Sequence, residues 1–210
     1  MGINTRITLA AADQVDEMIE VFLSAFKAEA TTAAWIDLSS DNLKHPYGEL
    51  VKIKIMLYLD AGNQIFVASE NNTIVGLTIL KLHHVKTSKI KAAQLVVPKL
   101  PRLMVLAPHF IRGMRMGMAD ATRTPENLPQ KHDVLEAIAV HPEHQGKKIG
   151  RKLLDHVHDY LNDNGSPGIY LMTGEEKNRQ IYERFGYALV EERDTKSFKS
   201  YHMYRSMTNQ

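Results

Sequence analysis

The sequence predicts an α+β protein that consists mostly of strands. Strand-like runs outnumber helical stretches and follow one another through short turns, as antiparallel strands do. One strand–helix–strand unit near residues 134–172 predicts a parallel crossover. The composition, 44% hydrophobic and 24% charged over 210 residues, is that of a globular chain.

The first third of the chain predicts two helices and three strands. A strand at residues 6–9 precedes a helix that Asp13 caps and that runs to about Glu29. Residues 31–40 are predicted as a loop that holds the single tryptophan. The later elements are a helix over residues 47–59 and two strands, 64–70 and 73–82, joined by Asn71 and Asn72 as a hairpin.

The middle of the chain, residues 83–130, is rich in proline and contains a helical stretch at 101–118 with several methionines. We interpret it as an insertion within a single domain that spans residues 1–210. Because methionine is flexible and polarizable, such a segment suits an adaptable pocket or a homodimer contact.

The last third alternates strands and helices. Residues 134–140 form an apolar strand broken only by Glu136, and residues 141–150 form a turn. The predicted elements that follow are a helix to about residue 162, a strand at 169–172, a helix at 176–185, and an antiparallel pair at 187–192 and 198–205.

Composition excludes several classes of function. A net charge of +2 is too small to indicate nucleic-acid binding, and the absence of cysteine excludes thiolate chemistry and disulfides. No apolar run reaches the ~18 residues of a membrane helix, and no signal pattern opens the chain, so a cytoplasmic location is expected. His141 and His144 lie three apart but lack further ligands, so no metal site is expected.

The turn at residues 145–150 is the strongest functional signal. It leads a buried strand into a helix, whose first amides lack partners and carry partial positive charge. Gly146 and Gly150 let a ligand approach the backbone, and four cations are close by, namely Lys147, Lys148, Arg151 and Lys152. Such a site suits a phosphate. The spacing fits neither a Walker A loop nor a Rossmann fingerprint.

This turn resembles the signature of the GNAT family of N-acetyltransferases, Gln/Arg-x-x-Gly-x-Gly/Ala, with Lys148 where a glycine is usual. The resemblance implies a central mixed, mostly antiparallel sheet flanked by helices. It also implies acetyl-CoA as co-substrate. The implied cofactor-binding residues are Gln145, Gly146, Lys147, Lys148, Ile149, Gly150 and Arg151, with Ile138, Ala139 and Val140 along the pantetheine arm.

A second block, Asn178 to Tyr187, resembles the family's Asn-x-x-x-Tyr-x-x-x-Gly-Phe/Tyr pattern. Asn178 and Tyr182 lie four apart, on one face of a helix that Gly186 ends. By resemblance, Asn178 contacts the cofactor and Tyr182 protonates the departing thiolate. The alternative is that Tyr182 only packs the helix.

Glu136 is the candidate general base, because an acid inside an apolar strand is costly without a partner and burial can raise its pKa. The alternatives are a structural ion pair with a nearby Lys or Arg, or a base at His132 or Asp133.

The expected activity is acetyl transfer from acetyl-CoA to the primary amine of a small molecule. The resemblance places the acceptor near Phe26, Trp35, Tyr47 and the segment 101–118, and the alternative for each of them is that it fills the core. Two alternatives stay open: acetylation of a protein or peptide amine, and a non-catalytic acyl-CoA-binding sensor. Neither a nucleic acid nor a membrane is an expected partner.

Overall fold

The computed structural model describes residues 5–27, 29–195 and 197–207. Within them, one seven-stranded sheet has the order β1-β2-β3-β4-β5-β7-β6. All neighbours are antiparallel except β4 and β5, which confirms the predicted mixed, mostly antiparallel sheet. The strands are β1 (Arg6–Leu9), β2 (Gln64–Glu70), β3 (Thr73–Lys81), β4 (Asp133–Val140), β5 (Gly168–Thr173), β6 (Ala188–Asp194) and β7 (Lys199–Ser206).

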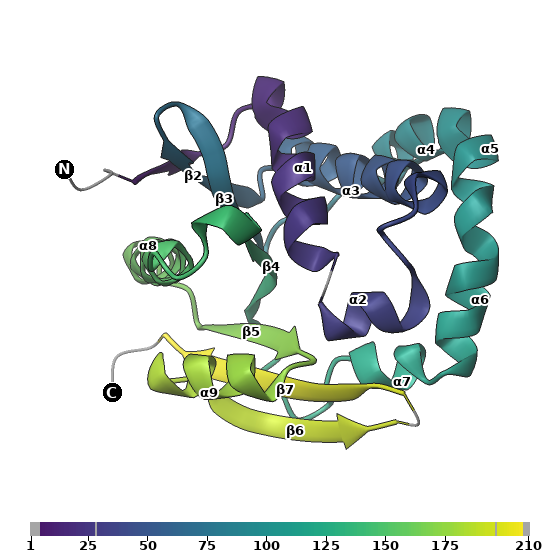
Figure 1. Ribbon diagram of the computed structural model, residues 1–210. Helices are drawn as coiled ribbons and strands as arrows, with labels where there is room; N and C mark the ends of the chain where they lie inside the picture. The colour runs from purple at the N-terminus through teal and green to yellow at the C-terminus, as the bar shows by residue number, and fades with distance from the viewer. Residues whose placement is uncertain (1–4, 28, 196, 208–210) are drawn as a thin grey trace.

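Helices cover both faces of the sheet (Figure 1). Helices α1 (Val15–Phe26) and α3 (Asp41–Ala61) pack on one face, and α8 (Ile149–Asp163) packs on the other. Helix α9 (Glu176–Arg184) contacts β5 and β7. Each face has its own buried apolar cluster. In the described part of the chain, no helix is both long and apolar enough to cross a membrane.

Helix α1 differs from the prediction at both ends. A short 3-10 turn, Ala12–Gln14, contains Asp13, so Asp13 does not cap the helix. The helix ends at Phe26, short of the predicted Glu29.

The predicted loop at 31–40 begins as a helix instead. Glu29 caps α2 (Ala30–Trp35), because its carboxylate accepts hydrogen bonds from the amides of Thr31 at 3.0 Å and Thr32 at 2.7 Å. Helix α3 starts six residues before the predicted position and continues through Pro46. Proline removes one backbone donor, and the helix tolerates that loss here.

The insertion is a chain of short helices: α4 (Lys89–Val96), α5 (Leu100–Leu103), α6 (Ala107–Arg115) and α7 (Met118–Thr122). Pro98, Pro101 and Pro108 lie in the first turns of their helical segments, where a missing amide costs little. The chain of helices runs past α3 and α2 and ends against β6 and β7 (Figure 1). There Arg193 Nη1 donates to the carbonyl of Asp120 at 2.6 Å, and His202 Nε2 lies 3.0 Å from the carbonyl of Ala121.

Candidate active site

Strands β4 and β5 are paired over a very short length. Their register joins Asp133 to Ile169 and Val134 to Tyr170, and then the two strands separate. From Leu135 onward, the edge of β4 that faces β5 has no strand partner among the described residues. Unpaired strand edges offer backbone donors and acceptors to an extended ligand. Ile138, Ala139 and Val140 all lie on this stretch.

A β-bulge sits at Glu136. Along β4 and β3, Leu135 pairs with Leu80 and Ala137 pairs with Ile79, which leaves Glu136 as the extra residue. Consequently Leu135 belongs to the core cluster on the α8 face, whereas Ala137 belongs to the cluster on the α1 and α3 face. Bulges re-aim side chains, and this one places the Glu136 carboxylate against α3.

The Glu136 carboxylate is held by two residues of α3. Lys54 Nζ lies 2.6 Å from Oε2, and the Tyr58 hydroxyl donates to Oε1 at 3.0 Å. Burial alone would raise the pKa of Glu136, but the charge and hydrogen bond of Lys54 and the Tyr58 hydrogen bond lower it overall. The expectation of a raised pKa is therefore wrong, because an ion pair compensates the burial. The Glu136 side chain remains 22% exposed.

The two alternative bases near the start of β4, Asp133 and His132, both form hydrogen bonds with other groups of the protein. The Asp133 carboxylate is buried, and it accepts hydrogen bonds from Ser166 Oγ at 2.5 Å and from the His83 amide at 2.7 Å. His132 Nδ1 lies 2.6 Å from the carbonyl of Pro129. Asp133 thus ties the start of β4 to the segment before β5.

The turn before α8 contains two residues in the left-handed region. Gly146 has a φ of 80° and Lys148, at the N-cap of α8, has a φ of 63°. For a residue with a side chain this region costs about 1–2 kcal/mol, which explains why glycine suits the position of Lys148. Ile149 is buried and anchors the helix start.

The turn presents a run of free amides. No described group accepts a hydrogen bond from the amides of residues 146–151, and the first amide with a partner is that of Lys152, which donates to Lys148. Together with the positive end of α8, this array suits a pyrophosphate.

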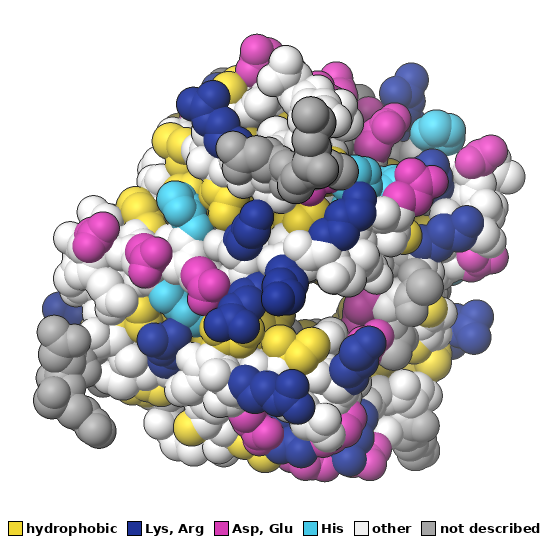
Figure 2. Space-filling view, turned by 60° about the vertical axis from the view of Figure 1, so that its left-hand side comes forward, with side chains coloured by type: hydrophobic (Ala, Val, Ile, Leu, Met, Phe, Trp, Pro, Cys, Tyr) yellow, Lys and Arg dark blue, Asp and Glu magenta, His cyan; other side chains and the backbone are white. Residues whose placement is uncertain are grey.

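The basic side chains of the turn divide into two groups. Lys148 and Lys152 are exposed and make no ion pair with the described residues, so their charges are available to a ligand. Lys147 instead lies 3.9 Å from the carboxylate of Glu70. Figure 2 shows Lys and Arg side chains gathered around a hollow on one face of the molecule.

Glu70, at the end of β2, was not predicted from the sequence. Its buried carboxylate lies 2.9 Å from His144 Nδ1 and accepts a hydrogen bond from Thr5 at 3.0 Å. Burial would raise its pKa, but the hydrogen bonds from Thr5 and His144 and the Lys147 charge lower it overall. Glu70 therefore fastens the turn to the sheet. It lies 74 residues from His144, so no local pattern indicates the contact.

The second sequence block forms α9, as predicted. Asn178 Nδ2 donates to Glu175 at 3.3 Å, and Gly186, with a φ of 81°, follows the helix. Tyr182 packs on the α8-side core, with its ring 5.6 Å from that of Tyr187. Burial raises the pKa of Tyr182 above its usual value of 10.0, and its hydroxyl makes no hydrogen bond with the described residues. The hydroxyl is therefore protonated at neutral pH and free to donate.

The three aromatic residues predicted near the acceptor lie in two clusters. The Trp35 ring lies 5.9 Å from Tyr47 and 4.8 Å from Phe110 of the insertion, and only 8% of Trp35 is exposed. Burial and then the Glu29 charge raise the pKa of Tyr47 to about 12. Phe26 stacks on Phe22 at 4.2 Å instead. Trp35 thus fills the core between α2 and the insertion.

The methionines of the insertion also divide. Met116 and Met118 pack on the cluster around Trp35, whereas Met104 and Met114 are 68% and 61% exposed.

Across the described residues, no group of three acidic, histidine or cysteine side chains is arranged to hold a metal ion.

The sequence matches one known protein family over most of its length. The model of the acetyltransferase (GNAT) family matches residues 28–187. No curated protein matches the sequence significantly.

Solved structures share the fold at low sequence identity. A histone acetyltransferase HPA2 and related acetyltransferase from Corynebacterium glutamicum is 17% identical over 98% of both chains, with a TM-score of 0.70. Arylalkylamine N-acetyltransferase 2 from Aedes aegypti is 14% identical over 98% of this chain and 100% of its own, with a TM-score of 0.64. YncA from Salmonella typhimurium, solved with its cofactor acetyl-CoA, is 15% identical over 98% and 95%, with a TM-score of 0.59.

Proposed function

Because the chain belongs to the GNAT acetyltransferase family, with acetyl-CoA as its co-substrate, we propose that it acetylates the primary amine of a small molecule. The observation that carries the proposal is the junction of two features: the free amides at residues 146–151 and the unpaired edge of β4 directly before them. The amides suit the pyrophosphate, and the strand edge suits the amide groups of the pantetheine arm.

Acetyl-CoA supplies an activated thioester, and the protein supplies orientation and proton transfer. The acceptor amine attacks the thioester directly, so no residue forms a covalent intermediate. A backbone amide of β4 near Ile138 polarises the thioester carbonyl by hydrogen bonding.

Glu136 accepts the proton that the acceptor amine loses, directly or through a water. The Lys54 and Tyr58 contacts keep this carboxylate ionised at neutral pH, and part of it stays exposed. A primary ammonium has a pKa near ~10, so deprotonation of the acceptor is a necessary step.

Tyr182 gives a proton to the departing thiolate. Its hydroxyl is protonated and makes no hydrogen bond with any residue that the structure describes, which supports this role. Glu136 contacts α3 on one face of the sheet, whereas Tyr182 packs in the α8-side core on the other. The gap between β4 and β5 connects these two faces, so an acceptor can arrive from the α3 side while acetyl-CoA lies along α8.

The inserted helices support a small acceptor. They run along α3 and α2 and end on β6 and β7, so they border the α3 side of the sheet from one end to the other (Figure 1). A bordered face admits a compact amine more readily than an extended peptide.

The test is thiol release from acetyl-CoA by the purified chain with a panel of acceptors: aminoglycosides, polyamines, arylalkylamines, amino acids and peptides. We expect turnover with at least one small amine, and mass spectrometry of that product should show one added acetyl group. Turnover with peptides alone would refute the small-molecule acceptor. Binding of acetyl-CoA without turnover on any acceptor would instead support the sensor alternative.

A further inference from the structure

The inserted helices between β3 and β4 carry a block of positive charge that the net charge of the chain does not reveal. Residues 71–119 contain no aspartate or glutamate. Between residues 83 and 119 the sequence has seven cations: Lys86, Lys89, Lys91, Lys99, Arg102, Arg112 and Arg115. Acidic residues elsewhere in the chain balance them, so the total is only +2.

Two of these seven cations have acidic partners on α3. Lys91 Nζ lies 3.3 Å from the Asp60 carboxylate. Lys99 pairs with Glu49. The other five are exposed and form no ion pair with any residue that the structure describes. Their charge is therefore open to a partner.

A row of apolar side chains lies exposed beside these cations. Residues 97–115 form one continuous helical run, about 28 Å long, that passes through α5 and α6. On its inner side, Leu106 and Phe110 pack with Trp35. On its outer side, six side chains at helical spacing are 46% to 68% exposed: Val97, Leu100, Met104, Val105, Ile111 and Met114. Contiguous exposed apolar patches mark interaction sites.

The polar side chains of this run indicate the chemistry of the partner. Between residues 97 and 115 they are Lys99, Arg102, His109, Arg112 and Arg115, so the run has no carboxylate, amide or hydroxyl side chain. A second copy of the chain would place the same cations against these, and like charges repel. A folded protein partner presents donors as well as acceptors, and its donors would find few acceptors here. A lipid surface presents phosphates to the cations and acyl chains to the apolar row.

We propose that the outer face of residues 97–115 binds an anionic membrane surface. The apolar row enters the headgroup layer, and Arg102, Arg112 and Arg115 contact lipid phosphates. This binding differs from the expectation that a membrane is not a partner. That expectation rested on net charge and on spanning segments, and neither reports a local face that is both apolar and basic.

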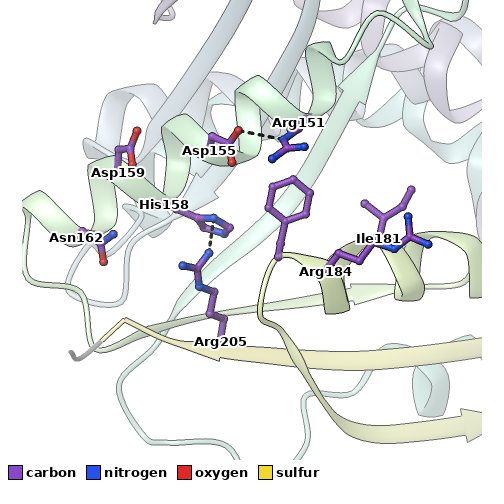
Figure 3. Close-up of a pocket in the computed structure, with 9 residues that line it drawn as sticks. Arg151, Asp155, His158, Asp159, Asn162, Ile181, Arg184 and Arg205 are labelled. Carbon is purple, nitrogen blue, oxygen red and sulfur yellow. Dashed lines mark hydrogen bonds and ion pairs between the residues drawn. The ribbon is translucent and has the colours of Figure 1, made fainter. Parts of the chain in front are cut away.

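The turn before α8 is a second basic surface, on the opposite side of the molecule from α6 (Figure 1). There Arg151, Arg184 and Arg205 line a pocket between α8, α9 and β7 (Figure 3). Asp155 and Asp159 line the same pocket, whereas the insertion has no acid before residue 120. Carboxylates repel lipid phosphates, so an anionic membrane should favour the insertion over this side.

Co-sedimentation of the full chain with lipid vesicles tests the proposal. We expect the chain to bind vesicles made of equal parts of phosphatidylglycerol and phosphatidylcholine. It should bind vesicles of phosphatidylcholine alone at least about tenfold more weakly, because these lack net negative charge. Raising the salt concentration should weaken the binding, because salt screens exposed charges.

Two pairs of arginine substitutions locate the contact. Arg112→Gln with Arg115→Gln should weaken binding to the anionic vesicles by about fivefold for each charge removed. The matched control is Arg151→Gln with Arg184→Gln, which removes two exposed charges from the side of the turn and should bind like wild type. Circular dichroism checks that both variants fold.

The apolar row is tested without any change of charge. Ile111→Ser with Met114→Ser should weaken binding to the anionic vesicles by about tenfold, because both side chains leave water in the bound state. Leu189→Ser, at a position of β6 that is 40% exposed, is the control and should bind like wild type.

Failure of the wild type to bind anionic vesicles would overturn the proposal and would point to an acidic protein as the partner. Equal loss of binding in the two arginine pairs would also overturn it, because the contact would then not be specific to the insertion. A third contrary result is a wild-type dimer, in analytical ultracentrifugation, that Ile111→Ser with Met114→Ser converts to a monomer. In that case a second copy covers this face.

Discussion

Replacing Lys148 by glycine should stabilise the folded chain and lower its affinity for acetyl-CoA. Lys148 has a φ of 63° at the N-cap of α8. Relief of the left-handed backbone contributes about 1–2 kcal/mol, and the larger conformational entropy that glycine loses on folding opposes this by about 0.5–1 kcal/mol. Removal of a cation from the positive end of a helix adds about 0.3–1 kcal/mol. The net gain of about 1 kcal/mol corresponds to a rise in Tm of about 2–4 °C for a chain of this size.

Lys148→Ala separates the two contributions. Alanine keeps the unfavourable backbone conformation and removes only the charge, so its Tm should rise by less than that of Lys148→Gly. Both variants lose the same cation, so both should bind acetyl-CoA more weakly, by about threefold at low salt, the size expected of one exposed charge. Raising the salt concentration should shrink that difference.

Scanning calorimetry without ligand and titration with acetyl-CoA at two salt concentrations provide both measurements. If alanine stabilises the chain as much as glycine does, the strain at Lys148 is not the cause. If neither variant changes the affinity for acetyl-CoA, then Lys148 tolerates the pyrophosphate without holding it.

Four further changes test the site. Tyr182→Phe should lower kcat by about 100-fold at unchanged acetyl-CoA affinity, and unchanged turnover would remove the acid role. Glu136→Gln should lower kcat similarly. Because the Glu136 pKa lies below its usual 4.5, the wild-type pH–rate profile should show no inflection from this group between about pH 5 and 8. Glu70→Gln should raise the KM for acetyl-CoA about tenfold with kcat unchanged, because it weakens the contacts that hold the turn to the sheet. A lower KM would instead mean that the main effect of the Glu70 charge is to repel the phosphates of acetyl-CoA. Burial lowers the pKa of His158 from 6.5 to about 4, so between these two pH values the His158 side chain is protonated in the unfolded chain but neutral in the folded one. Urea denaturation should therefore show unfolding free energy rising over this range, by at most about 3 kcal/mol, and this rise should be absent in His158→Gln.

The sequence predicted the elements whose signals are local. The hairpin at Asn71 and Asn72 was predicted from adjacent residues, and both have the positive φ that such turns require. Gly186 likewise ends α9 as predicted. The parallel crossover followed from an apolar strand, an amphipathic helix and a second strand in succession.

Features that depend on distant residues could not be predicted this way. The ion pair of Glu136 joins residues 82 apart, and the sequence could indicate only that some partner was required. The bulge that turns this side chain toward α3 depends on the register with β3, which no pattern within β4 specifies. Local rules also misplaced the start of α3, because Pro46 is normally a signal that no helix continues through it.

The short pairing of β4 with β5 has a mechanical consequence. Strands β1 to β4 and strands β5 to β7 form two subsheets that share a register of only two residue pairs. The insertion leaves β3 in the first subsheet and ends on the second, where Arg193 and His202 bond to its last helix. The insertion therefore joins the two subsheets at a second place, away from the β4–β5 pairing. Because few backbone hydrogen bonds join the subsheets at the gap, we expect local opening to begin there. Hydrogen exchange should report them as two cooperative units, with the amides that flank the gap exchanging first.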